Sequence, residues 1–241
     1  MEKFYHFIHP MISYPHLRSF AAATLLLAAV AHAQPEITAA ELRQHVGFLT
    51  SPELDGRKLG TPGTAKAEDY IAEAMRASGL KPLGDAGGYF QEFEVKGGKG
   101  RNVIGMLEGS DPVLKEQVLI IGAHHDHIGT KRPRGDAGEC VLHPGADDNA
   151  SGVAGLLELV ESFASTKAEL KRSIVFIAFA GEEAGLLGSR HYVAHPTVPL
   201  ARTVAMINHA GPPASGTGRL PGGWWRPRRW AGPPSCRASP S

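Results

Sequence analysis

The sequence lacks several patterns, and each absence excludes a class of protein. Its 241 residues contain only two cysteines, Cys140 and Cys236, which lack the CxxC spacing of a zinc ribbon and do not indicate a disulfide framework. The net charge of +1 leaves no basic surplus for nucleic acid or an anionic membrane surface. No G-x-G-x-x-G turn or P-loop is present, which argues against a nucleotide-binding α/β domain.

The N-terminus carries the pattern of an export signal. Arg18 precedes an apolar run over residues 20–30, and residues 31–33 (AHA) form an A-x-A cleavage site. The run is too short to cross a bilayer. We therefore expect residues 1–33 to be a signal peptide, and the mature chain to be exported to the periplasm or the outside, with no membrane span. The alternative is an uncleaved membrane anchor.

The C-terminus has a different composition from the rest of the chain. Residues 209–241 hold all three tryptophans and two Pro-Pro pairs, contain no acidic residue and show no apolar periodicity. We expect this segment to be disordered or translated out of frame, although a natural Pro/Arg-rich tail has the same composition. Residues 34–208 are then the folded part, a partial domain that lacks the elements needed to cover its last strand.

The folded part alternates strand and helix patterns. A capping box at residues 38–41 predicts a helix from about Ala39, and a second helix is expected over 64–78. Residues 89–95 and 102–107 read as a hairpin. Beyond them we expect strands 117–123, 173–180 and 203–207, helices 149–164 and 185–195, and a long loop over 124–147. This order predicts a three-layer α/β/α fold with a mixed, centrally parallel sheet that is incomplete at the C-terminus.

Metal-binding side chains follow the apolar runs. His124 and Asp126 follow one expected strand, Asp148 precedes a helix, and Glu182 and Glu183 follow another strand. Ligands of open α/β sheets bind at the carboxyl ends of the strands, so these groups are expected to converge. A shared carboxylate such as Asp148 can bridge two ions, Asp126 can orient His124, and one of the two glutamates can bind metal while the other acts as general base. Zinc suits these ligands, as do cobalt and manganese.

Three segments together resemble a known family. Residues 122–129 (GAHHDHIG), 145–152 (GADDNASG) and 179–189 (FAGEEAGLLGS) are similar to the motifs of the secreted two-zinc aminopeptidases, whose relatives include plasma glutamate carboxypeptidases and glutaminyl cyclases. Upstream, residues 54–57 (LDGR) and 60–63 (GTPG) are similar to the N-terminal portion of the same family. The resemblance covers about residues 38–208.

The resemblance implies a role for each of these residues. His124 would bind the first zinc and Asp126 would orient it, Asp148 would bridge both ions, Glu183 would bind the second, and Glu182 would take a proton from a metal-bridging water. The implied activity is release of N-terminal amino acids from peptides, with a carboxypeptidase or a glutaminyl cyclase-type acyltransferase as alternatives. His125 and His127 match less constrained positions and are expected to be structural or solvent-facing.

The sequence departs from the family pattern after Asn208. The family continues with an apolar residue and a zinc-binding Asp, where this chain has His209 and Ala210, and no later residue matches the family's final histidine ligand. Each zinc would keep only the bridging Asp148 and one ligand of its own. We therefore expect weak zinc binding and impaired activity, and a non-catalytic fragment is the rival reading.

Overall fold

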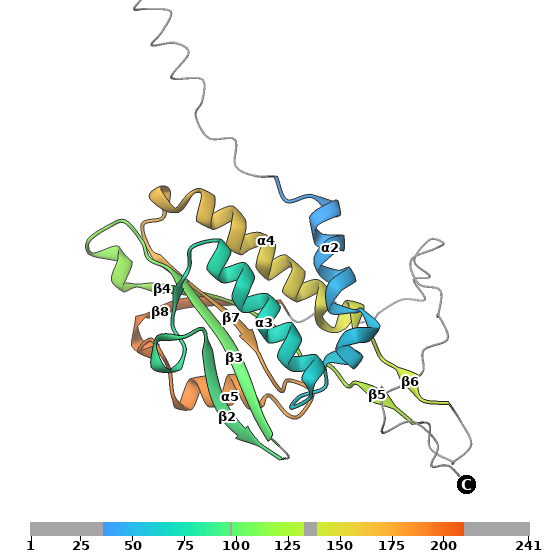
Figure 1. Cartoon of the computed structure of the whole chain (residues 1–241). Helices are drawn as coiled ribbons and strands as arrows, with labels where there is room; N and C mark the ends of the chain where they lie inside the picture. Colours follow the sequence, from blue (N-terminus) through green and yellow to red (C-terminus); the bar gives the residue numbers. More distant parts are fainter. Residues whose placement is uncertain (1–35, 97, 133–138, 210–241) are drawn as a thin grey trace, which may run out of the picture. The chain divides into compact units, whose positions relative to one another are not determined.

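The computed structural model describes residues 36–96, 98–132 and 139–209 (Figure 1). The expected signal peptide and nearly all of the expected tail lie outside these ranges. The helices are α2 (Ala39–Leu49), α3 (Pro62–Ala77), α4 (Ser151–Ser165) and α5 (Leu187–Ala194). The strands are β1 (Lys81–Pro82), β2 (Phe90–Val95), β3 (Gly98–Leu107), β4 (Val118–His124), β5 (Thr130–Lys131), β6 (Val141–Leu142), β7 (Ser173–Phe179) and β8 (Thr203–His209).

One mixed sheet of six strands organises the described part of the chain. Its order is β1-β3-β7-β4-β8, and β2 pairs with β3 as the predicted hairpin. β4 runs parallel to both β7 and β8, whereas β3 runs antiparallel to β7. The expected mixed sheet with a parallel centre is thus confirmed. All seven residues of β7 are buried, as an apolar central strand covered on both faces requires.

Helices cover both faces of this sheet, but unequally. Figure 1 shows α2, α3 and α4 together on one face and α5 on the other. The larger apolar core lies under α3 and α4 and includes Ile71, Leu156 and Phe176. The smaller core, with Ile120, Ile177 and Tyr192, lies under α5. The two cores give the three-layer α/β/α arrangement that the alternating pattern predicts.

Local signals account for the helix ends. The Thr38 side chain accepts the Glu41 N–H, and the Glu41 carboxylate accepts the Thr38 N–H, so the capping box forms as predicted at the start of α2. Before α4 the chain makes an irregular turn over Ala146–Ala150, and the Asp148–Asn149 peptide bond is cis. The regular helix begins at Ser151 rather than at residue 149. Asn149 Oδ1 accepts the Gly152 N–H at 3.1 Å, next to the start of this helix.

Three structural features were not predicted from the sequence. Residues 52–57 form a 3-10 helix, in which Asp55, Gly56 and Arg57 all have positive φ angles. The expected loop over 124–147 contains the short antiparallel pair of β5 and β6. Cys140 is disulfide-bonded, whereas the sequence did not indicate a disulfide framework. Within the described ranges no helix is both long and apolar enough to cross a bilayer.

Candidate metal centre

The candidate site lies at the carboxyl ends of β4 and β7. His124 is the last residue of β4 and pairs with Phe179, the last residue of β7. The chain after β4 carries Asp126 and His127, and the chain after β7 carries Glu182 and Glu183. The parallel register thus brings two distant polar segments to one edge of the sheet, where ligands of α/β proteins bind.

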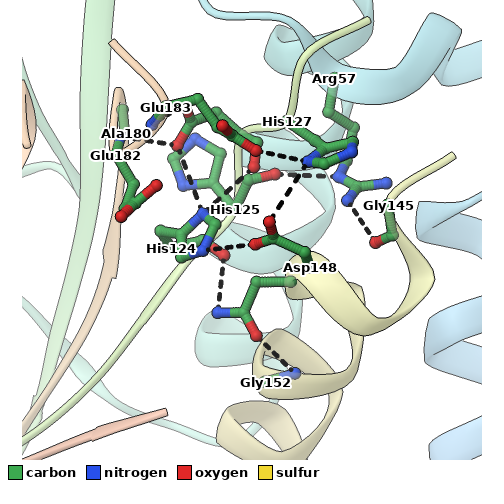
Figure 2. A network of polar contacts seen from close by, with 12 residues as sticks. Arg57, His124, His125, His127, Gly145, Asp148, Gly152, Ala180, Glu182 and Glu183 are labelled. Atoms are coloured by element: carbon green, nitrogen blue, oxygen red, sulfur yellow. Dashed lines mark hydrogen bonds and ion pairs between the residues drawn. The ribbon is translucent and has the colours of Figure 1, made fainter. Parts of the chain in front are cut away.

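Two histidine–carboxylate contacts form the centre of the site (Figure 2). His124 Nε2 lies 3.0 Å from Asp148 Oδ1, and His127 Nδ1 lies 2.6 Å from Glu183 Oε1 and 4.0 Å from Asp148 Oδ2. Donor atoms of His127, Asp148 and Glu183 all lie within 4.8 Å of one another. The structure therefore brings His124, Asp148 and Glu183 together and adds His127, which the sequence analysis had placed among structural or solvent-facing residues.

Asp126 joins the two polar segments. Its carboxylate is fully buried and accepts the backbone N–H groups of Glu182, at 3.0 Å, and Glu183, at 3.4 Å. Its Oδ1 lies 3.7 Å from His124 Nδ1, which is too long for a hydrogen bond, and the Asp126 backbone carbonyl is the closer partner at 3.2 Å. Asp126 thus orients the glutamate segment directly and acts on His124 mainly through its charge.

The charges around His124 and Asp126 shift the pKa values of both side chains. Burial alone lowers the pKa of His124, but Asp126, Glu182 and Asp148 outweigh it and leave the pKa raised. Burial alone raises the pKa of Asp126, but its neighbours His124 and His125 and the Glu182 N–H leave it lowered.

Glu182 differs from Glu183 in direction. Figure 2 shows the Glu183 side chain turned toward His127, whereas the Glu182 carboxylate lies apart from that pair, on the other side of His124 in this view. The two glutamates therefore suit different tasks. Glu183 belongs to the cluster of metal-binding donors. Glu182 lies outside this cluster, and its carboxylate is of the type that can transfer a proton.

A buried arginine supports the site from behind. Arg57 is fully buried and donates to four backbone carbonyls: those of His125 at 2.9 Å, Pro144 at 2.8 Å, Gly145 at 3.0 Å, and Leu49. Burial lowers its pKa to about 10, so it stays charged at neutral pH. Arg57 thereby ties the segment after β4 to the turn that carries Asp148. Sequence reasoning missed this role, because only the LDGR resemblance marked the residue.

His125 and His209 take no part in the cluster of donor atoms. His125 is fully buried, with Nε2 3.4 Å from Glu68 Oε1 on α3, so its role is structural. His209, which stands where the family has an apolar residue, ends β8 with an exposed side chain, and its backbone carbonyl accepts the Asn149 side-chain N–H at 2.6 Å.

The donor set fits zinc. Two imidazoles and two carboxylates at one edge of a sheet are common zinc ligands. His127 Nδ1 is also buried without a hydrogen-bond partner of acceptable geometry, despite its short distance to Glu183. A buried polar atom left in this state indicates a ligand-binding position rather than a finished hydrogen-bond network.

Comparisons with known proteins agree with this chemistry. Residues 102–220 match peptidase family M28. A probable zinc metalloprotease of Pyricularia oryzae is 35% identical over 175 residues, which cover 68% of this chain and 32% of the relative. Aminopeptidase YwaD of Bacillus subtilis is 29% identical over 147 residues, or 60% of this chain and 27% of the relative. The chain thus spans about a third or less of the length of these two relatives.

Solved structures show the same fold. A Zn-dependent exopeptidase of Parabacteroides distasonis aligns with a TM-score of 0.56 at 22% identity, covering 73% of this chain and 62% of that one. A glutaminyl cyclase of Porphyromonas gingivalis aligns with a TM-score of 0.53 at 23% identity, covering 71% and 58%. At these identities the likeness concerns the fold alone. The family assignment rests on the sequence match, which places residues 102–220 of this chain in peptidase family M28.

Proposed function

We propose that the chain is a zinc-dependent metallo-exopeptidase-type hydrolase that releases N-terminal amino acids from peptides. The observation that carries this proposal is the meeting of His124, Asp148 and Glu183 at one edge of the sheet, with Glu182 beside them. The names of the relatives support zinc and the aminopeptidase reaction. The number of ions and the role of each residue are part of the proposal.

The residues divide the work as follows. His124, Asp148 and Glu183 would hold zinc, which when bound polarises the substrate carbonyl and lowers the pKa of water. Glu182 would take a proton from the water that attacks the carbonyl carbon. The same carboxyl group would then give the proton to the leaving amine as the C–N bond breaks. Asp126 would act as a positioning residue, since it holds the backbone of both glutamates.

An assay on the full chain with added zinc tests this function. We expect slow, zinc-dependent hydrolysis of an aminoacyl amide and none of its N-acetylated form, because an exopeptidase of this type needs a free N-terminus. Glu182→Gln should lower kcat by about 10²–10⁴-fold, the usual contribution of a general base. Zinc affinity should stay unchanged, and Glu94→Gln, an exposed glutamate on β2, should have no effect.

Three outcomes would contradict the proposal. Hydrolysis that is unaffected by Glu182→Gln would show that Glu182 is not the general base. Zinc-dependent turnover of an N-terminal glutaminyl peptide to its cyclic product, or removal of a C-terminal residue, would favour one of the two alternative reactions. A chain that neither binds zinc nor turns over any of these substrates would behave as the non-catalytic fragment.

Export of the chain is a separate proposal and rests on the sequence alone. Residues 1–33 lie outside the described ranges, and the A-x-A pattern before Gln34 is its support. N-terminal sequencing of exported protein should find a mature chain that begins at Gln34. Recovery of the chain with residues 1–33 still attached would favour the membrane anchor instead.

A further inference from the structure

We propose that His127 is a metal ligand, and that with Asp148 and Glu183 it forms a three-ligand zinc site. This inference rests on the proposed function and deepens it, because it changes the number of protein ligands at one ion. Neither the resemblance nor the sequence pattern assigned His127 such a role. Three features support this role: the place of the His127 ring, the groups that its Nδ1 atom faces, and the number of ligands that a zinc ion needs.

The His127 ring is held in place from two directions. Its backbone N–H donates to the Arg57 carbonyl at 3.1 Å, which fixes the residue against the 3-10 helix. The ring packs against Gly145, where an added Cβ atom would come within 2.6 Å of His127 Cγ. Gly145 also has a φ of +60°, so both the space and the backbone favour glycine there. The turn that leads to Asp148 thus leaves a gap that the imidazole fills.

The His127 Nδ1 atom faces two carboxylates but lacks a proper hydrogen-bond partner. It lies 2.6 Å from Glu183 Oε1 and 4.0 Å from Asp148 Oδ2, and the side chain is only 13% exposed. The contact with Glu183 is short, yet its direction does not satisfy a hydrogen bond. A tetrahedral zinc ion holds its nitrogen and oxygen ligands about 3.3 Å apart. The two distances from His127 Nδ1, 2.6 and 4.0 Å, lie on either side of that value, and Figure 2 shows the three side chains turned toward one another.

Counting ligands shows why His127 matters. A catalytic zinc usually has three protein ligands and one open position. From the family pattern alone, each ion of this chain would have two, with Asp148 counted for both. His127 raises the number to three at the ion bound by Glu183, while the ion bound by His124 keeps two among the described residues. We therefore expect one tightly held zinc per chain rather than two.

The simplest rival is a salt bridge between a protonated His127 and Glu183. Such a pair would stabilise the fold without binding metal. Variants at position 127 separate the two readings, because the Oδ1 atom of Asp or Asn branches from Cγ as Nδ1 does in histidine. Asp provides a zinc ligand at that place, whereas Asn fills the same space with an amide that binds zinc poorly.

The test measures zinc stoichiometry by elemental analysis and zinc affinity by chelator competition on the full chain. We expect the wild type to bind one zinc. His127→Ala and His127→Asn should weaken binding by more than about 100-fold, beyond the range seen when only a partner of a ligand is lost. His127→Asp should recover most of that loss. His195→Ala, an exposed histidine at the end of α5, is the matched control and should bind zinc as the wild type does.

Each result decides one claim. Equal zinc affinity in the wild type and His127→Asn would overturn the ligand role of His127 while leaving the proposed function intact. Equal losses in the Asn and Asp variants would make the residue structural and would also overturn it. A wild-type chain that binds no zinc would instead contradict the proposed function itself. If His127→Ala fails to fold, the Asn and Asp pair still decides the question.

Discussion

The carboxylate of Asp126 accepts the backbone N–H of Glu182 at 3.0 Å and so joins the segments that follow β4 and β7. The two residues are far apart in sequence, yet the parallel pairing of the strands puts one directly beside the other. The hydrogen bond orients a backbone rather than a side chain. It fixes where both glutamates begin and leaves their carboxylates free to face the site.

Replacing Asp126 by Asn should weaken zinc binding without unfolding the chain. The amide oxygen can still accept the Glu182 N–H, but the negative charge that faces His124 is lost. We expect zinc affinity to fall by about 10–100-fold, as for other partners of metal ligands. Chelator competition measures it, with Asp69→Asn, an exposed residue, as control. Unchanged affinity would show that Asp126 serves the fold alone.

Replacing Arg57 by Met should destabilise the protein strongly. The variant leaves two buried and two part-buried carbonyls without their donor, and each unsatisfied buried group costs about 1–3 kcal/mol. We expect a loss of about 3 kcal/mol or more in the free energy of unfolding, measured by urea titration of metal-free protein. Arg57→Lys should rescue little, because one ammonium group cannot reach carbonyls on several sides. Arg190→Met, at an exposed position of α5, should be nearly neutral. An equally small effect of Arg57→Met would show that the four hydrogen bonds of Arg57 do not stabilise the fold.

Glu158 makes stability depend on pH from a place remote from the metal site. Burial, helped by Glu41 and Glu161, raises the pKa of this α4 carboxyl group, which lies 3.2 Å from His45 Nε2. A raised folded pKa gives stability that is present below the unfolded pKa and lost as pH rises through the folded pKa. Glu158→Gln should therefore stabilise the chain at pH 8 and be neutral near pH 4.

Urea titrations at pH 4, 6 and 8 check this pH dependence. The gain from Glu158→Gln should grow with pH, whereas Glu53→Gln, at an exposed position, should show no such trend. A gain that is the same at every pH would show that packing, and not ionisation of Glu158, sets the difference.

The sequence alone predicted most of the fold, for local reasons. The apolar runs of β4 and β7 and the capping box of α2 are signals that short stretches contain, and the structure has each of them. The roles of Arg57 and His127 come from contacts between distant segments, such as Arg57 with Gly145. A sequence pattern does not show which carbonyl groups a buried guanidinium will contact. The positions of these two residues could therefore be recognised only in the structure.

The edge strand β8 should promote self-association. Among the described residues it pairs only with β4, and Val204, Met206 and Ile207 are each about half exposed. A free edge with apolar side chains is a template for pairing with another chain. Met206→Lys together with Ile207→Lys should lower light scattering of concentrated protein. Val113→Lys, an exposed apolar residue in a loop, is the control, and equal scattering in both variants would place the association elsewhere.

The most direct test of the metal centre is an anomalous diffraction map at the zinc absorption edge, from crystals of the full chain grown with zinc. We expect one strong peak within bonding distance of His127 Nδ1, Asp148 and Glu183. Any peak between His124 and Asp148 should be much weaker. No peak at this edge of the sheet, or one whose only ligands lie elsewhere, would contradict the metal centre.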